Sequence, residues 1–206
     1  MQDVKLSDWL EQLAAKQPTP GGGGAAALFA ATAAALVGMV SIYTTGPKWS
    51  KVSDRMQAIH DEADVLRRQA LELITADAEA FAAVGTAYSL PKDSDEQKQQ
   101  RAKAIQVALA GAAKPPQAAA DCAIKVLELA SELVQAGNPN VISDVAVAAA
   151  AARAALESAN VNILINAKLI SDSQIKAALE DSMTEAEKAI LKAADIIAKT
   201  QQRITA

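Results

Sequence analysis

Asp77 is the residue whose type and surroundings best suit catalysis. Its neighbours in the segment 76–82 are alanines and one phenylalanine, apart from Glu79. Apolar neighbours withdraw a carboxylate from water and raise its pKa toward the range useful for general acid or base chemistry. Glu79 lies about 200° further round a helix, so the two carboxylates do not form a pair and partners must come from other segments. Taken alone, the residues favour the alternative of a solvated surface carboxylate.

Four adjacent glycines, Gly21, Gly22, Gly23 and Gly24, follow the rigid segment Pro18-Thr19-Pro20 and precede an alanine run. Consecutive glycines cost backbone entropy, so their presence predicts close approach by a ligand or by another backbone. The free amides of a helix start would suit a carboxylate or phosphate. A flexible loop or a helix crossing is the structural alternative. The run is neither a Walker loop nor a dinucleotide fingerprint, because no Gly-Lys-Ser/Thr follows and no strand precedes it.

Five further polar residues are candidates for binding. Asn138 and Asp144 flank a predicted turn and helix start, where both side chains also serve as caps. Asn162 and Asn166 are four apart, hence on one helical face among apolar residues, where an amide needs a partner. They either contact a ligand or bridge helices. Lys48 directly follows a long uncharged segment and is either a ligand for an anionic group or a solvated loop cation.

The elements that position these residues are predicted to be helices throughout. Apolar residues recur at three and four spacing, and no alternating strand pattern persists. The prediction is an all-α, single-domain bundle of about seven helices over residues 1–206, with no sheet. The first two expected helices are 6–16 and 21–45, and the third runs to residue 90 from a cap at Ser50 or Ser53. The fourth is capped by Asp93 or Ser94 and ends before Pro115, and the fifth is 117–136. The sixth runs from Ser143 or Asp144 to 169, and the seventh begins at Asp172 or Ser173.

Composition narrows the function. Of the residues, 51% are hydrophobic and only 3% aromatic, which is typical of closely packed helices. The net charge of −4 gives no basic surface for nucleic acid. A single cysteine and a single histidine argue against a disulfide, a Cys/His metal cluster and a secreted location. We expect a cytoplasmic protein without a metal or other cofactor.

One segment has the length of a membrane span. No charged residue occurs between Gln17 and Pro47, and 25–42 is long enough to cross a bilayer. Alanine, glycine and threonine dominate it, which favours close helix packing inside a soluble bundle. The amino terminus lacks the pattern of a secretory signal. We therefore expect no membrane association.

Several blocks of the chain, in order, resemble one family. The start Pro-Thr-Pro-Gly-Gly-Gly at 18–23 and its alanine-rich helix resemble the amino-terminal motif of the cyclodeaminase/cyclohydrolase family, which includes methenyltetrahydrofolate cyclohydrolases and formiminotetrahydrofolate cyclodeaminases. Four later blocks resemble the family pattern at matching spacing. They are Asp-Ala-Glu-Ala-Phe at 77–81, Tyr-Ser-Leu-Pro-Lys at 88–92, Gly-Asn-Pro-Asn-Val-Ile-Ser-Asp at 137–144 and Asn-Val-Asn-Ile-Leu-Ile-Asn at 160–166.

The resemblance implies hydrolysis of 5,10-methenyltetrahydrofolate to 10-formyltetrahydrofolate, with Asp77 as the general acid/base. It implies substrate binding by Gly21, Gly22, Gly23, Lys48, Asn138, Asp144, Asn162 and Asn166, and a homodimer. Gly24 stands where many cyclodeaminases have serine, which favours the cyclohydrolases. Pro47 and Trp49 replace a lysine run followed by tyrosine, which puts a role for that aromatic in doubt.

Two alternatives stay open at this point. One is cyclodeamination of formiminotetrahydrofolate with release of ammonia. The other is a non-catalytic folate-binding helical dimer, for which Pro47 and Trp49 are the best support.

Overall fold

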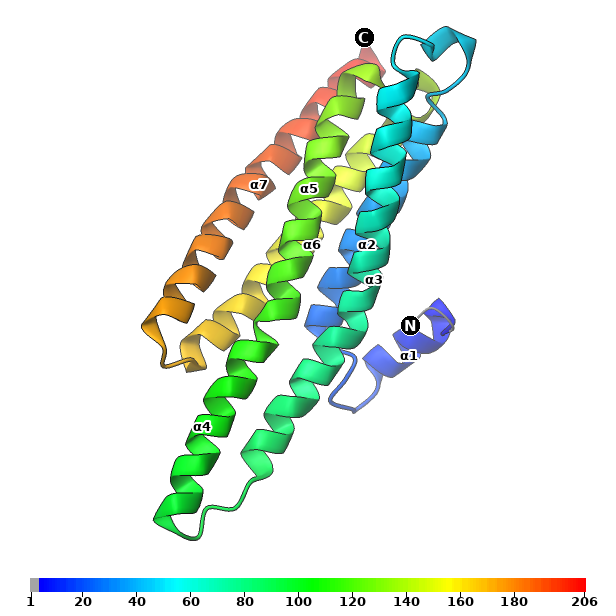
Figure 1. The fold of residues 1–206 in the computed structure, drawn as a ribbon. Coiled ribbons are helices and arrows are strands. Elements are labelled where there is room, and N and C mark those ends of the chain that lie inside the picture. The colour runs from blue at the N-terminus through cyan, green and yellow to red at the C-terminus, as the bar shows by residue number, and fades with distance from the viewer. Residues whose placement is uncertain (1–3) are drawn as a thin grey trace.

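The computed structural model describes residues 4–206. This part of the chain forms seven α-helices and two short 3-10 helices, and it contains no strand (Figure 1). The predicted all-α class with about seven helices is confirmed for these residues. The elements are α1 (Leu6–Ala14), α2 (Gly22–Ile42), η1 (Pro47–Trp49), α3 (Ser53–Ser89), α4 (Asp95–Ala112), α5 (Lys114–Ala136), η2 (Pro139–Val141), α6 (Ser143–Leu169) and α7 (Ser173–Thr205).

Helix α2 forms the centre of the bundle, where it packs against α3, α5 and α6. Its inward residues are small, and Ala26, Ala30 and Ala33 are fully buried. Small side chains let the neighbouring backbones approach closely, which explains why an alanine-rich segment is placed here. Of the described helices, α2 alone is long and apolar enough to span a bilayer, and 56% of the relevant window is buried inside the bundle. The absence of membrane association stays a prediction.

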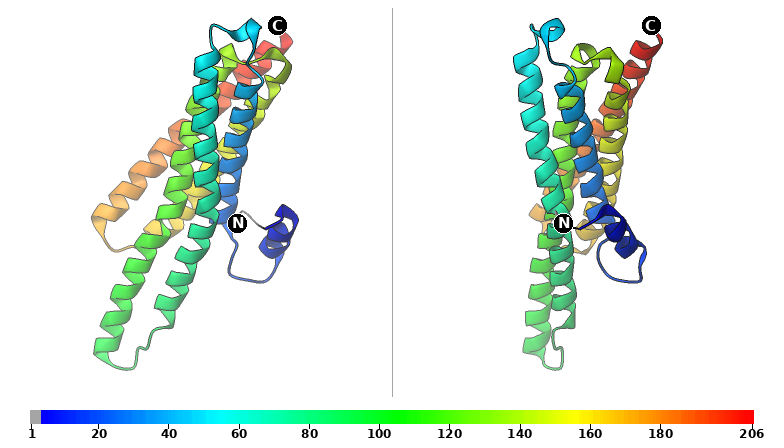
Figure 2. Two further views of the ribbon diagram at one scale, coloured as in Figure 1. Left: turned by 45° about the vertical axis from the view of Figure 1, so that its right-hand side comes forward. Right: turned by 90° about the vertical axis from the view of Figure 1, so that its right-hand side faces the viewer.

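Helices α3 and α4 form a hairpin whose tip extends beyond the rest of the bundle (Figures 1 and 2). α4 ends at Ala112 and α5 begins at Lys114, so the two helices follow each other with hardly a break. The predicted start of this helix at Gln117 is therefore wrong. Pro115 and Pro116 lie within the first turn of α5, where proline is tolerated because those positions need no intrahelical N–H bond.

The predicted cap of α4 is confirmed and that of α3 is wrong. The Ser94 hydroxyl accepts a bond from the Gln97 amide at 3.2 Å in a complete capping box, and the Asp172 carboxylate accepts bonds from the first amides of α7. Neither Ser50 nor Ser53 caps α3, whose cap position is Val52. The Val52 amide donates to the Trp49 carbonyl at 2.9 Å, so the η1 turn leads directly into α3.

Helix α1 lies against the start of α2 and makes few contacts with the bundle. Trp9 is its one buried residue, and it packs with Ile74, Ala27 and Ala119. Leu6 and Leu10 of this short helix are about half exposed, whereas Leu13 is partly buried against the same cluster. Figure 2 shows α1 standing off the bundle as an arm, in front of the beginning of α2 in the right-hand view.

Candidate active site

Asp77 lies in the second half of α3 with its carboxyl group against the first turn of α2. An alanine Cβ placed at Gly23 would lie only 2.5 Å from the Asp77 Cγ and 2.8 Å from its Oδ2. A side chain at position 23 would overlap the Asp77 carboxyl group. Because Gly23 has none, the carboxyl group reaches the start of α2. This contact is the close approach that the run of glycines predicts.

The environment of Asp77 disfavours its charged form. Burial raises the pKa of the Asp77 carboxyl above its ordinary value, and the interaction with the Gly24 backbone amide opposes that rise without cancelling it. A carboxyl group with a raised pKa accepts and returns a proton more readily near neutral pH than a solvated one. The sequence-based prediction of a partly desolvated Asp77 is borne out by this geometry.

A cavity of about 250 Å³ adjoins the carboxyl group. Its walls come from the loop before α2, the first turn of α2, and parts of α3, α4, α5 and α6. Among the described residues that line it, Asp77 is the one ionisable side chain, and none is cationic. The lining residues are Pro18, Thr19, Gly21, Gly22, Gly23, Asp77, Phe81, Val84, Leu109, Ala112, Pro116, Asn162, Ile165, Asn166 and Leu169.

Asn162 and Asn166 both line this cavity from α6, because residues four apart lie on the same face of a helix. The Asn162 side-chain nitrogen donates to the Ser158 carbonyl at 2.8 Å, and that of Asn166 donates to the Asn162 carbonyl at 2.9 Å. The Asn166 nitrogen also contacts the Ala112 carbonyl at 3.5 Å, which links α6 to the end of α4. The side-chain oxygens of both residues and the second hydrogen of the Asn162 nitrogen are therefore the groups left for a ligand.

Three of the predicted site residues lie at the other end of α2. The Asn138 side chain donates to the Tyr43 carbonyl at 2.7 Å and accepts from the Asn140 amide, and its own amide donates to the Thr44 hydroxyl. These bonds hold the η2 turn onto the end of α2. Since α2 has 21 residues, this end is about 30 Å from Gly22.

Lys48 and Asp144 share that distant end. Lys48 is exposed, and its ammonium nitrogen lies 5.0 Å from the centre of the Trp49 ring. Asp144 lies in the first turn of α6, where a carboxylate stabilises the helix dipole. Within one chain, therefore, the structure brings together Asp77, Gly21, Gly22, Gly23, Asn162 and Asn166, but not Lys48, Asn138 or Asp144.

Several lining residues were not singled out from the sequence. Phe81 follows Asp77 by four positions, so it lies on the same helical face, and this spacing could have identified it. Leu109, Ala112 and Pro116 come from the α4–α5 junction, and nothing in their local pattern indicates that they face a cavity.

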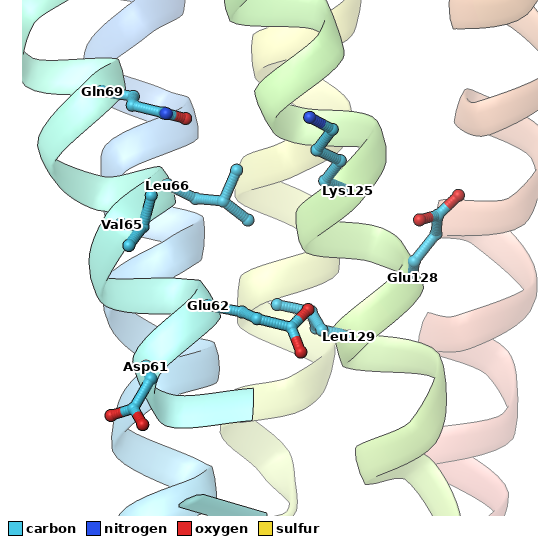
Figure 3. Close-up of a pocket in the computed structure, with 8 residues that line it drawn as sticks. All are labelled: Asp61, Glu62, Val65, Leu66, Gln69, Lys125, Glu128 and Leu129. Atoms are coloured by element: carbon cyan, nitrogen blue, oxygen red, sulfur yellow. The ribbon is translucent and has the colours of Figure 1, made fainter. Parts of the chain in front are cut away.

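A larger groove of about 590 Å³ runs over the surface between α3 and α5. Figure 3 shows Leu66 and Leu129 pointing into the space between the helices, whereas Asp61 and Glu128 point outward. At one end Arg55 bridges the helices by bonds to Glu62 and Glu132. The groove contains no partly buried carboxyl group comparable to Asp77, so we place the candidate site at the smaller cavity.

The chemistry available at the cavity is proton transfer by a carboxyl group with amide groups to orient a ligand. Across residues 4–206, no three His, Cys, Asp or Glu side chains are grouped so that they could hold a metal ion. The absence of a cofactor stays a prediction.

Comparison with known sequences identifies the family. The sequence model of the formiminotransferase-cyclodeaminase family matches residues 5–185. The chain belongs to this family. Within it, the chain is 41% identical to a methenyltetrahydrofolate cyclohydrolase from Methylorubrum extorquens over 88% of this chain and 86% of that protein. The predicted family membership is confirmed.

Longer and more distant members also match. The chain is 32% identical to the mouse formimidoyltransferase-cyclodeaminase over 84% of its own length, but it spans only 32% of that protein. The crystal structure of a formiminotetrahydrofolate cyclodeaminase from Thermotoga maritima has a TM-score of 0.88 at 29% identity, and the match covers 100% of this chain and 99% of that one. The whole helical arrangement is thus shared with an enzyme of this family.

Proposed function

We propose that the protein hydrolyses 5,10-methenyltetrahydrofolate to 10-formyltetrahydrofolate, with Asp77 as the general acid/base. The observation that carries the proposal is the position of Asp77, the one ionisable side chain among the described residues that line the cavity. The substrate carries a positive amidinium group, and an anionic carboxylate in an otherwise uncharged cavity suits it. The 41% identity to a cyclohydrolase over most of the chain supports the same choice.

In the proposed reaction, the Asp77 carboxylate accepts a proton from a water molecule as the water oxygen bonds to the amidinium carbon. The resulting carbinolamine is neutral. Asp77 then gives its proton to the leaving N5 nitrogen while the carbon–nitrogen bond breaks. The hydroxyl proton leaves to solvent as the formyl C=O forms, so the loss of positive charge on the folate is balanced by release of one proton.

The size of the cavity suggests which part of the folate it holds. A volume of about 250 Å³ is slightly below the roughly 300–1,000 Å³ of typical ligand pockets. The fused ring with its reactive carbon fits such a space, while the aminobenzoyl-glutamate tail extends past exposed apolar residues such as Phe81 and Leu169. In this proposal the oxygens of Asn162 and Asn166 accept bonds from the ring's amino and amide groups. No metal or organic cofactor takes part, and the reaction takes place in the cytoplasm.

The direct test follows the absorbance of methenyltetrahydrofolate in a buffer where spontaneous hydrolysis is slow. We expect rapid loss with the wild type, and a decrease in kcat of about 10²–10⁴-fold for Asp77→Asn, the range that general acid/base catalysis supplies. Circular dichroism of both proteins controls for folding. Equal rates for the two proteins would remove Asp77 from the mechanism.

Cyclodeamination of formiminotetrahydrofolate is the second candidate, favoured by the match to the Thermotoga cyclodeaminase over the entire chain. The same carboxyl group could protonate the departing ammonia. Ammonia release from the formimino compound without methenyl hydrolysis would establish this alternative. Folate binding without turnover of either compound would instead establish a non-catalytic binding protein.

A further inference from the structure

The Trp9 side chain reaches the back of the candidate site from helix α1. It is 4% exposed and belongs to a small cluster, apart from the main core, with Ala27, Ile74 and Ala119. These three residues come from α2, α3 and α5, so three helices of the bundle meet at one aromatic ring. Trp9 is the one buried residue of α1, which otherwise stands off the bundle (Figure 2). The indole ring is therefore the principal anchor of this arm.

The same ring lies against the backbone at the start of α2. An alanine Cβ placed at Gly24 would lie 3.5 Å from the Trp9 Cζ2 atom, an ordinary van der Waals contact. It would also lie 3.6 Å from the Ile74 Cγ2 atom and 4.0 Å from the Pro20 Cβ atom. The first turn of α2, the middle of α3 and the loop of residues 15–21 thus converge beside the ring.

The segments that converge there carry the parts of the site. The Gly24 backbone amide interacts with the Asp77 carboxyl group. The loop before α2 contributes Pro18, Thr19 and Gly21 to the cavity wall. Because α1 makes few other contacts with the bundle, the position of this loop on its α1 side depends on the indole ring.

We propose that Trp9 is a positioning residue for the reaction, because its ring holds the loop 15–21 and the first turn of α2 against Asp77. Trp9 is not among the described residues that line the cavity, so it acts through its neighbours and not on the substrate. This role rests on the proposed function, in which Asp77 is the general acid/base. A displacement of about 1 Å in a catalytic site costs on the order of 100-fold in rate, so a ring behind the wall is able to control the reaction.

Steady-state kinetics of Trp9 variants test this role. Trp9→Ala should raise KM, because the displaced loop no longer forms one wall of the cavity. It should also lower kcat, because the Gly24 amide no longer faces the Asp77 carboxyl group. We expect kcat/KM to fall at least roughly tenfold, and Trp9→Phe, which keeps an aromatic ring, to recover most of the loss. A variant that had merely lost folded protein would show a lower apparent kcat with an unchanged KM.

Leu10→Ala is the matched control on the same helix, since Leu10 is 48% exposed. It should retain the wild-type kcat and KM. Trp9→Leu keeps an apolar side chain in the cluster and takes the place of Trp9→Ala if circular dichroism shows that the alanine variant is unfolded. Wild-type KM in the Trp9 variants, or equal losses in Trp9→Ala and Leu10→Ala, would overturn the proposal.

Trypsin cleavage tests the anchoring without any activity. Lys16 lies in the loop and is exposed, and the bond after it leads to Gln17. We expect this bond to be cleaved roughly fivefold faster or more in Trp9→Ala than in the wild type, because release of the ring lets the loop open locally. Mass spectrometry of the fragments identifies the cleaved bond, and Leu10→Ala should match the wild type.

The cleavage rates separate the two proposals. Equal cleavage at Lys16 in Trp9→Ala and the wild type would overturn the role of Trp9, whatever the activity of the protein. A wild type that does not turn over methenyltetrahydrofolate would overturn the proposed function, and the cleavage rates would still decide whether Trp9 holds the loop.

Discussion

At the scale of single residues, the contact between Asp77 and Gly23 defines the site. A half-buried carboxyl group with a raised pKa and no cation beside it is unfavourable for folding in its charged form. Proteins retain such groups mainly where they act on a ligand. Gly23 makes this placement possible because its missing Cβ leaves room for the carboxyl oxygens.

Substitution of Gly23 by alanine should therefore displace the Asp77 carboxyl group. The new Cβ would lie 2.5 Å from the Asp77 Cγ, so the acid must move out of the cavity while α2 itself remains helical. We expect at least a tenfold loss of kcat with nearly unchanged circular dichroism. Gly85→Ala on α3 is the matched control, since a Cβ there meets nothing within 4 Å. Comparable activity of the two variants would contradict this account.

The raised pKa of Asp77 also predicts how stability depends on pH. A carboxyl group with a higher pKa in the folded than in the unfolded state binds its proton more tightly when folded, so it stabilises the fold below its unfolded value near 3.8. That stabilisation is lost as pH rises through the folded pKa. We expect Asp77→Asn to be at least as thermally stable as the wild type at pH 7. Thermal melts of both proteins from pH 3 to 7 test this, and a less stable variant at pH 7 would contradict it.

Which residues meet in the site was only partly predictable from the sequence. The glycine run, Asp77 and the pair Asn162 and Asn166 could be found because each breaks a local apolar pattern. Asn138 and Asp144 fit a family block equally well, yet they lie at the far end of α2. A block in the sequence does not fix the end of a helix bundle at which a residue lies, because packing decides it.

At the scale of helices, the ends are set by hydrogen bonds more than by residue type. Ser94 and Asp172 cap helices because extended residues precede α4 and α7 and leave the side chains free to turn back. Ser50 follows a 3-10 turn that already satisfies the local amides, so it has no such role. The helical pattern itself was predictable throughout, whereas boundaries next to turns and prolines were predictable only within a few residues.

The contrast between Ser94 and Ser50 gives a test. Ser94→Ala removes the acceptor of the Gln97 amide, and we expect the free energy of unfolding to fall by about 1 kcal/mol. Ser50→Ala should change it by less than about 0.5 kcal/mol, as for a surface position. Urea denaturation of the two variants and the wild type measures both values. Equal losses would show that the capping box contributes nothing specific.

At the scale of the whole molecule, one face of the central helix α2, which carries the exposed Phe29 and Ile42, is uncovered. If the homodimer that the family resemblance implies forms through this face, a charge placed there should prevent pairing without disturbing the bundle, because Phe29 is partly exposed. We expect Phe29→Glu to have the mass of one 21.3 kDa chain by light scattering, whereas the wild type should have the mass of two. Val107→Glu, at a position 75% exposed on α4, should retain the wild-type mass and is the control.

The projecting hairpin of α3 and α4 has a consequence for dynamics. Its tip lies beyond the other described helices, and at its base Ala87, Ile105 and Leu109 belong to a small second core shared with α6 and α7. Amide protons near the tip should therefore exchange with solvent earlier than those of α2, since local opening there breaks few packed contacts. The cavity spans the base of the hairpin and α6. A bound molecule that joins these walls would slow exchange along the hairpin, so occupancy of the site could be observed at amides that the ligand never touches.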